Sequence, residues 1–181
     1  GSIGFAISLY NTPAWTGAPG VGTLFRHALL TNMTSGLRFN GAALCITNCR
    51  FYSTAGMGAM RVGPDQAQGS VVTRSYFYAF VPHLGADLRS SGFSMTLNHW
   101  VSGSWSFSVS YQAYTINAGQ VTQNWFDGSA QAYAWDVTQP IPLANNYWGG
   151  GLPGLFGNAS TNQYNFTPAL GSVPAFCGPT W

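Results

Sequence analysis

Residues 93–97 read FSMTL and residues 105–111 read WSFSVSY, and in both runs apolar side chains alternate with small polar ones. Successive side chains of a β-strand point to opposite faces, so a period of two predicts strands. Each of these two strands is expected to bury one face and to present hydroxyl groups on the other. The pair of runs makes a β-sheet protein the first expectation for the whole chain.

Further strand segments lie on both sides of these runs. Residues 37–47 are largely apolar, residues 71–81 are rich in aromatic side chains, and residues 130–137 carry Tyr133 and Trp135. The aromatic content of 71–81 predicts a strand that is covered on both faces. Residues 56–69 hold four glycines, a proline and an aspartate, which favours a long loop.

One short helix is predicted over residues 23–31. Leu24, Phe25, Ala28 and Leu29 would share an apolar face there, with Thr23 as the N-cap. A helix of two to three turns is stable only when it packs against another element, so we expect it to lie on a sheet.

The composition favours an all-β fold independently of these patterns. The 181-residue chain contains no Lys and no Glu, and its length suits one domain. Residues that stabilise exposed helices are therefore scarce, whereas β-branched and aromatic residues suit pleated sheets. No repeat of 20 to 50 residues is evident, which argues against solenoids and propellers.

Three regions are expected along the chain: an N-terminal arm at residues 1–22, a globular domain at 23–138, and an extended C-terminal tail at 139–181. The tail is rich in Gly and Pro and also rich in aromatic side chains, which are stable in water only when something covers them. A tail of this kind is expected to lie across a neighbouring molecule. The predicted subunit-interface residues are Tyr147, Trp148, Phe156, Tyr164, Phe166, Phe176 and Trp181.

The surface is expected to be neutral, because charged residues make up 6% of the chain and aromatic residues 15%. Two interpretations fit: a secreted domain kept soluble by hydroxyls and amides, or a subunit whose surface is covered by partners. The six arginines are scattered and give a net charge of +2, which is too sparse for a nucleic-acid-binding stripe. Any contact with RNA is therefore expected to be light or indirect. No membrane insertion is expected, since no apolar stretch of 18 residues occurs.

Catalytic and metal-binding motifs are weak in this chain, so we expect it not to be an enzyme and to need no cofactor or metal. Its acids are four aspartates, of which Asp65 and Asp127 stand next to turn glycine or proline residues. Its three histidines accompany no nucleophile elbow. The cysteines Cys45, Cys49 and Cys177 are an odd number without zinc-site spacing, which favours buried free thiols over a disulfide or a metal site. A hydrolase that uses the few Asp and His residues is the weakest hypothesis.

The middle of the chain, residues 23–137, resembles the capsid proteins of picorna-like viruses. The similarity lies in a short helix followed by TSGLRF (34–39), in the AFVP turn (79–82), and in NHW (98–100) followed by SFSVSYQAYT (106–115). Ser110 stands where the family usually has Pro.

The resemblance implies an eight-stranded antiparallel jelly-roll sandwich with one short helix and extended N- and C-terminal segments. It also implies a structural subunit of an icosahedral virion that encloses an RNA genome, of the compact kind found in plant-infecting members. The expected partners are other capsid subunits, genomic RNA indirectly, and a host receptor. The alternative is a secreted or cell-surface carbohydrate-binding module that uses exposed Trp and Tyr side chains to stack on sugars.

Overall fold

The computed structural model describes residues 7–10, 23–33, 37–40, 44–53, 58–62, 70–85, 94–101, 107–110, 119–127, 131–135, 141–149, 151–152, 154–157 and 164–181. Within these residues the chain forms short strands and no helix. No described segment has the length and apolarity of a membrane-spanning helix.

The described strands fall into three large sheets and one small one. The seven-stranded sheet contains, in spatial order, β1 (Ile7–Tyr10), β4 (Leu37–Asn40), β7 (Gly58–Val62), β10 (Phe80–Gly85), β13 (Phe107–Ser110), β16 (Gln131–Trp135) and β19 (Gly154–Gly157). The five-stranded sheet contains β2 (Thr23–Arg26), β5 (Leu44–Thr47), β8 (Val71–Thr73), β11 (Ser94–Thr96) and β14 (Val121–Thr122). The six-stranded sheet contains β3 (Leu29–Met33), β6 (Arg50–Ser53), β9 (Tyr76–Tyr78), β12 (His99–Val101), β15 (Trp125–Asp127) and β18 (Tyr147–Trp148). The small sheet pairs β17 (Ile141–Pro142) with β20 (Tyr164–Asn165).

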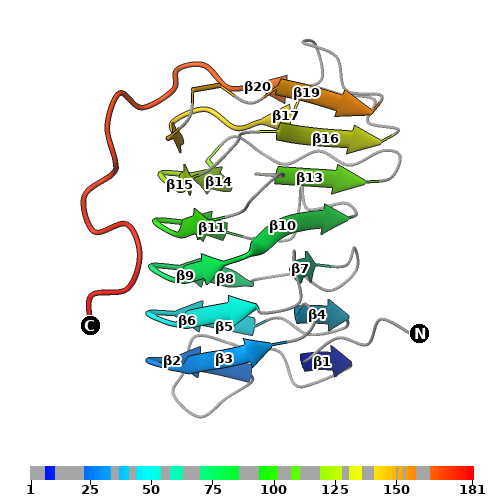
Figure 1. Cartoon of the computed structure of the whole chain (residues 1–181), viewed down its shortest axis with the longest axis vertical. Helices are drawn as coiled ribbons and strands as arrows, with labels where there is room; N and C mark the ends of the chain where they lie inside the picture. Colours follow the sequence, from blue (N-terminus) through cyan, green and yellow to red (C-terminus); the bar gives the residue numbers. More distant parts are fainter. Residues whose placement is uncertain are drawn as a thin grey trace.

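All strand pairings among the described residues are parallel, and in the large sheets each strand pairs with the strand three places later in the chain. The chain therefore winds as a solenoid in which each coil adds one strand to each large sheet (Figure 1). This architecture is a parallel β-helix. The predicted antiparallel jelly roll is wrong, although the chain is built from strands as expected. The physical reason is that alternation along a strand specifies its buried face but not the direction of its neighbour.

The helix predicted at residues 23–31 is also wrong. This segment forms β2 and β3, separated by a corner at His27, whose φ is 50°. Leu24 and Leu29, which would share one helix face, are both exposed on the outside of the coil. The prediction failed because a short strand, a one-residue corner and a second short strand space apolar residues much as a helix does.

Two other segments differ from their predicted form. Residues 71–81 are not one strand, because the backbone turns at Arg74 and Ala79, whose φ values are 48° and 57°. The loop predicted at residues 56–69 contains β7, which pairs with both β4 and β10.

The same corner recurs between the five-stranded and six-stranded sheets, and its sequences align once the structure is known. They read FRHALLT (25–31), ITNCRFY (46–52), VTRSYFY (72–78), MTLNHWV (95–101), VTQNWFD (121–127) and LANNYWG (143–149). The third residue of each motif has a positive φ, and these residues stand at positions 27, 48, 74, 97, 123 and 145. Successive motifs are therefore separated by 21, 26, 23, 26 and 22 residues. The expectation that the chain has no repeat was wrong because these unequal intervals conceal a seven-residue motif from any search at a fixed period.

A ladder of polar side chains lines the inside of this corner. Asn98, Asn124 and Asn146 are fully buried, and each hydrogen-bonds to the coil before it. Ser75 takes the same position one coil earlier, where its hydroxyl accepts the backbone N–H of Cys49 at 3.1 Å. Buried amide groups are tolerated only when they are hydrogen-bonded, so this ladder fixes how successive coils are aligned.

The core consists of two stacks that follow the ladder on either side. On the six-stranded sheet, each ring stacks on the ring in the next coil, with centroids 3.9 to 6.5 Å apart, through Phe51, Phe77, Trp100, Phe126 and Trp148. On the other side of the corner lie the buried side chains of Ile46, Val72, Met95, Val121 and Leu143. Phe166 packs edge-on against Trp148 and extends the ring stack.

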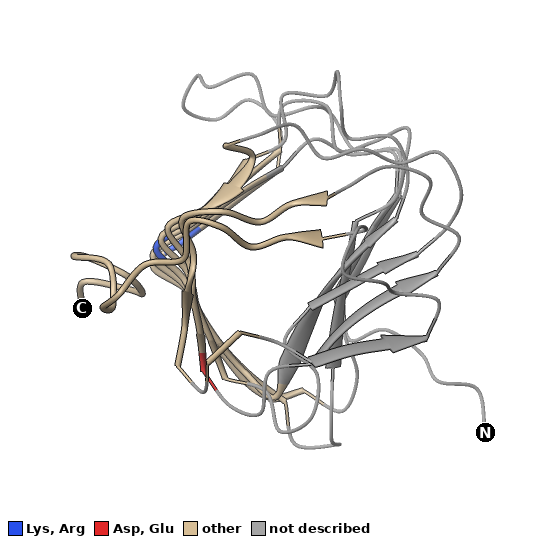
Figure 2. Cartoon of the chain, turned by 90° about the horizontal axis from the view of Figure 1, so that it is seen from above, with Lys and Arg blue, Asp and Glu red and all other residues tan. Residues whose placement is uncertain are grey.

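The C-terminal segment, residues 166–181, lies along the outside of the corner. It runs back from the last coil toward the first (Figure 1), and from above it lies where the five-stranded and six-stranded sheets meet (Figure 2). The region predicted as the tail, 139–181, thus begins with β17 and β18, and the predicted arm, 1–22, contains β1. The C-terminal segment lies on its own chain, whereas we expected it to lie on a neighbour.

Candidate functional site on the outer face of the six-stranded sheet

Six ring side chains form a continuous band on the outer face of the six-stranded sheet. This aromatic band consists of Tyr52, Tyr76, Tyr78, His99, Trp125 and Tyr147. It exists because the residue after each ladder position points outward and, in four successive coils, is a ring. Tyr52 and Tyr78 add rings from the far ends of β6 and β9.

The rings of the band contact one another from coil to coil. The imidazole of His99 stacks on the indole of Trp125 with centroids 3.6 Å apart, and Tyr76 meets His99 edge-on at 5.0 Å. Tyr52 lies between Tyr76 and Tyr78, at 5.5 and 6.0 Å. The stacked pair hides its own ring faces, so the ring that is most open to a ligand is Tyr78, which is 46% exposed.

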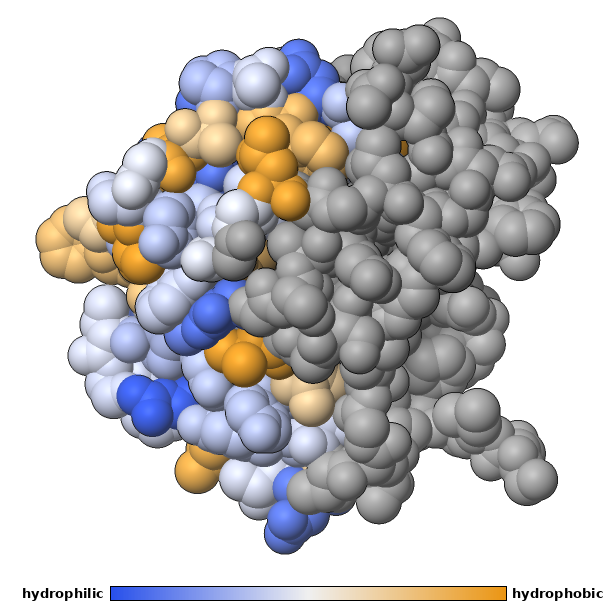
Figure 3. Space-filling view, turned by 45° about the horizontal axis from the view of Figure 1, so that its top comes forward, coloured by the Kyte–Doolittle hydropathy of each residue, from blue (hydrophilic) through white to orange (hydrophobic). Residues whose placement is uncertain are grey.

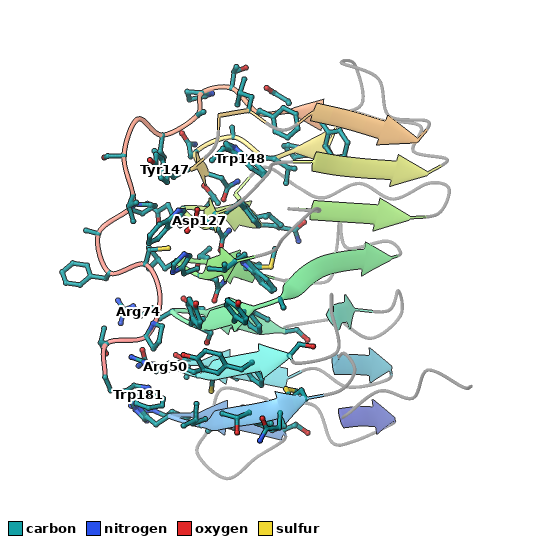
Figure 4. The ribbon with its side chains drawn as sticks, viewed as in Figure 1. Arg50, Arg74, Asp127, Tyr147, Trp148 and Trp181 are labelled. Atoms are coloured by element: carbon teal, nitrogen blue, oxygen red, sulfur yellow. The ribbon has the colours of Figure 1, made fainter. Side chains whose placement is uncertain are left out.

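One acidic group lies beside the band. Asp127 ends β15, and its carboxylate Oδ2 is 3.6 Å from Nε2 of His99. A Cβ atom built on Gly149 would come within 3.2 Å of Asp127 Oδ1 and 3.3 Å of Trp125 Nε1. Gly149 thus leaves room for the carboxylate beside the indole, at the place shown by the Asp127 and Tyr147 labels in Figure 4.

The nitrogens that face this carboxylate lie beneath the surface. Trp125 Nε1 and His99 Nε2 are buried and form no hydrogen bond within the described residues. The Asp127 side chain is 45% exposed. Asp127 is thus an open hydrogen-bond acceptor next to two buried ring nitrogens, and it is the only acid whose side chain the structure describes.

The electrostatics of the band follow from this burial. Burial lowers the pKa of His99 below its ordinary value of 6.5, while the nearby charge of Asp127 acts in the opposite direction. Burial also raises the pKa of Tyr76, and the neighbouring Tyr52, Tyr78 and Asp127 raise it further. Both shifts favour the uncharged forms of His99 and Tyr76 at neutral pH.

Such a surface can bind a ligand but lacks a recognisable catalytic set within the described residues. A glycosidase needs two carboxyl groups that face one bond, and Asp127 is the only described one. The other candidates from the sequence, Asp65, Asp87, Asp136 and His83, have side chains outside the described residues. No group of three His, Cys, Asp or Glu side chains that could hold a metal occurs among the described residues.

The predicted interface residues are distributed over several environments. Trp148, Tyr164 and Phe166 are buried in the core of the last coil. Tyr147 lies in the aromatic band, and the Phe156 side chain is outside the described residues. Phe176 and Trp181 are exposed on the C-terminal segment, at 73% and 45%. The residues expected to act together thus divide between core, band and tail.

The cysteines are free thiols, as the residues suggested. Cys45 and Cys49 are buried, and Cys177 is partly exposed on the C-terminal segment. Burial raises the pKa of all three, to about 11 for Cys177, so they remain protonated at neutral pH.

The aromatic band was not predicted from the sequence, although the sequence contains a signal for it. Tyr76 and Tyr78 were expected to be covered, and Asp127 was assigned to a turn. The seven-residue motif places a ring at its fifth position in VTRSYFY, MTLNHWV, VTQNWFD and LANNYWG. Aligning these motifs would have placed Tyr76, His99, Trp125 and Tyr147 in one row.

Comparison of the chain with protein-family models, with characterised proteins and with solved structures finds no match. The class of protein is therefore defined here by architecture: a parallel β-helix with an aromatic band along one face.

Proposed function

We propose that this chain is a carbohydrate-binding β-helix whose aromatic band and Asp127 hold a neutral, hydroxyl-rich saccharide. The observation that carries the proposal is the exposed carboxylate of Asp127 at the side of a continuous row of rings. Ligand sites of this kind combine apolar and aromatic surface with a few placed polar groups.

The chemistry of a sugar is complementary to both parts of this surface. Its C–H faces can pack on an open ring such as Tyr78, and its hydroxyls can donate to Asp127. The phenol groups of Tyr52 and Tyr76 are further donors and acceptors in the same row. These groups lie within four successive coils and can contact one ligand together.

The length of the band favours a chain over a single sugar. Strands of neighbouring coils lie about 4.8 Å apart, so the four steps from β6 to β18 span roughly 19 Å. The ligand that fits such a row is an oligosaccharide or polysaccharide lying along the solenoid axis.

The charge of the molecule favours a neutral ligand. Nucleic acids and other polyanions require a long basic stripe, whereas this chain has six arginines and a net charge of +2, and the described arginines Arg26, Arg50 and Arg74 gather at one corner (Figure 2). In the space-filling view of Figure 3, apolar side chains lie in small groups between polar ones over the described surface.

The capsid role implied by the resemblance has less support. It depended on an antiparallel jelly roll, and the chain forms parallel coils. It also depended on a C-terminal tail that covers a neighbour, and residues 166–181 lie on their own chain. The carbohydrate-binding alternative requires neither feature.

A glycan array followed by titration of the ligands that bind tests the proposal. Tyr78→Ala and Asp127→Asn are expected to weaken the affinity at least tenfold, which corresponds to about 1.4 kcal/mol. Leu24→Ala is the matched control, since Leu24 is equally exposed but lies on the five-stranded sheet. Absence of binding to every neutral glycan, or equal binding by the two band variants and the control, would overturn the proposal.

A further inference from the structure

The C-terminal segment, residues 166–181, forms a strap that contacts the corner through a small set of specific groups. Near its start, the Pro168 carbonyl accepts the Asn145 N–H, and the Leu170 N–H donates to the Asn146 carbonyl at 3.0 Å. Near its end, residues 176–181 contact earlier coils. The strap thus spans the corner from the last coil back to β6.

Gly178 makes the first specific contact between the end of the strap and the corner. Its N–H donates to the Leu97 carbonyl at 2.8 Å, and the residue is buried. Its φ is +84°, and an added Cβ would stand 3.6 Å from the Cβ of His99. Glycine adopts this backbone conformation readily, whereas other residues are strained there. The corner therefore selects glycine at this position.

Cys177 is the second contact. Its thiol lies 3.0 Å from the Asn98 carbonyl and 3.9 Å from the Gln123 carbonyl. The side chain is turned toward the corner, while its neighbour Phe176 is turned out into solvent and is 73% exposed.

Trp181 makes the third contact, which holds the end of the strap on the corner. Its indole N–H donates to the Asn48 carbonyl at 2.5 Å, and its backbone carbonyl accepts a hydrogen bond from the Arg50 guanidinium. That guanidinium also lies over the indole, 4.9 Å from the ring centroid. Figure 4 shows Arg50 and Trp181 side by side at the end of the strap.

In all three contacts the strap donates to main-chain carbonyls of corner residues. Asn48, Leu97 and Gln123 each occupy the positive-φ position of the recurring motif. Asn98, the nearer acceptor of the Cys177 thiol, is the residue after Leu97. The corner therefore offers main-chain carbonyls from three coils to the strap, which reaches them with one backbone N–H, one thiol and one indole N–H.

We propose that this corner is a binding site for a short peptide segment and that residues 176–181, FCGPTW, are the ligand that occupies it. Recognition depends on Gly178, on the thiol of Cys177 and above all on Trp181. This inference is independent of the carbohydrate site, because it concerns the corner and not the outer face of the sheet.

Thiol labelling of the full chain tests whether the strap opens as proposed. Trp181→Ala is expected to raise the rate of Cys177 alkylation at neutral pH at least tenfold, as followed by mass spectrometry of the labelled peptides. The buried Cys45 and Cys49 report the integrity of the coils and are expected to stay protected. Phe176→Ala is the matched control, since it removes a strap ring that faces solvent, and is expected to leave the rate unchanged. Equal rates in wild type and Trp181→Ala would overturn the proposal.

A peptide added in trans tests whether the corner recognises its ligand. A fluorescent peptide with the sequence of residues 173–181 is expected to bind the Trp181→Ala chain, whose own strap is weakened, more tightly than the wild-type chain. The same peptide with Trp181→Ala is expected to bind neither chain. Binding of both peptides alike, or of neither, would contradict the proposal. A wild-type dimer that dissociates on Trp181→Ala would assign the site to the strap of a second copy and overturn occupancy by the chain's own strap.

Discussion

Asn124 accepts the backbone N–H of Asn98, one coil away, on its side-chain Oδ1 at 3.1 Å. Its own side-chain nitrogen donates back to the Met95 carbonyl at 2.9 Å and to Asn146 Oδ1 at 3.0 Å. A single amide thus joins three consecutive coils inside the corner. This arrangement explains why an apolar-cored solenoid carries fully buried polar side chains.

Asn124→Ala is expected to destabilise the protein by about 3 kcal/mol, because it leaves buried partners in the adjacent coils without their hydrogen bonds. Chemical denaturation measures the loss as a lower midpoint. Gln123→Ala is the control: Gln123 is exposed, and its main-chain hydrogen bond to Asn145 does not involve the side chain. It is expected to change stability by less than about 0.5 kcal/mol. Equal effects of the two substitutions would show that the ladder does not hold the coils together.

Trp100→Ala is expected to be among the most costly substitutions in the core, at about 4 kcal/mol. Trp100 is fully buried, and its ring stacks on Phe77 at 3.9 Å. Trp100→Phe is expected to cost less than about 1.5 kcal/mol, since it keeps a ring in the stack. It also removes an indole N–H that has no hydrogen-bond partner within the described residues. Denaturation midpoints of the two variants provide the comparison, and a similar loss in both would argue against stacking as the main contribution.

Arg74→Asn is expected to stabilise the protein by about 0.5 kcal/mol. Arg74 is exposed with a φ of 48°, a conformation that asparagine adopts more easily than other residues with a side chain. The chain already has asparagine at the equivalent positions 48 and 145. Arg74→Gln separates the effect of charge from that of conformation, and thermal unfolding measures both. A gain with Gln as large as with Asn would assign the effect to charge.

The pKa of His99 is expected to lie below 6.5 in the wild-type protein. It is expected to be lower still in Asp127→Asn, because that substitution removes the opposing carboxylate charge. NMR titration of the imidazole measures both values. Because the folded pKa lies below the unfolded value, the unfolded chain binds a proton first as the pH falls. The contribution of His99 to stability is therefore fully present above about pH 6.5 and is lost as the pH falls toward the folded pKa. A pKa that rises in Asp127→Asn would contradict the proposed contact.

Much of the local structure could be predicted from the sequence. The alternation around Met95 and in residues 107–110 predicted strands, and β11 and β13 lie there. The absence of Lys and Glu correctly indicated a fold without long surface helices within the described part. The cysteines were predicted as free thiols, which they are. The aromatic residues of the tail were predicted to lie at a subunit interface, whereas Trp148, Tyr164 and Phe166 are buried in the core of their own chain.

The site could not be predicted in the same way. His99, Trp125 and Asp127 come from adjacent coils, and their proximity depends on parallel stacking with one particular register. Read singly, Asp127 before a glycine is ordinary turn chemistry and His99 is one of three scattered histidines. The residues that meet at the strap are even farther apart in the sequence, since Arg50 and Trp181 are separated by 131 positions.

Side-chain alternation and composition act locally, so they were sufficient to predict short strands with aromatic and hydroxyl-bearing faces. Three features depend instead on how the coils stack: the strands run parallel, the rings form a band, and the C-terminal segment lies on the corner of its own chain. The physical reason is that strand direction and register are set by contacts between coils, above all by the buried Asn98, Asn124 and Asn146 ladder. Those contacts join residues more than twenty positions apart at intervals that vary along the chain.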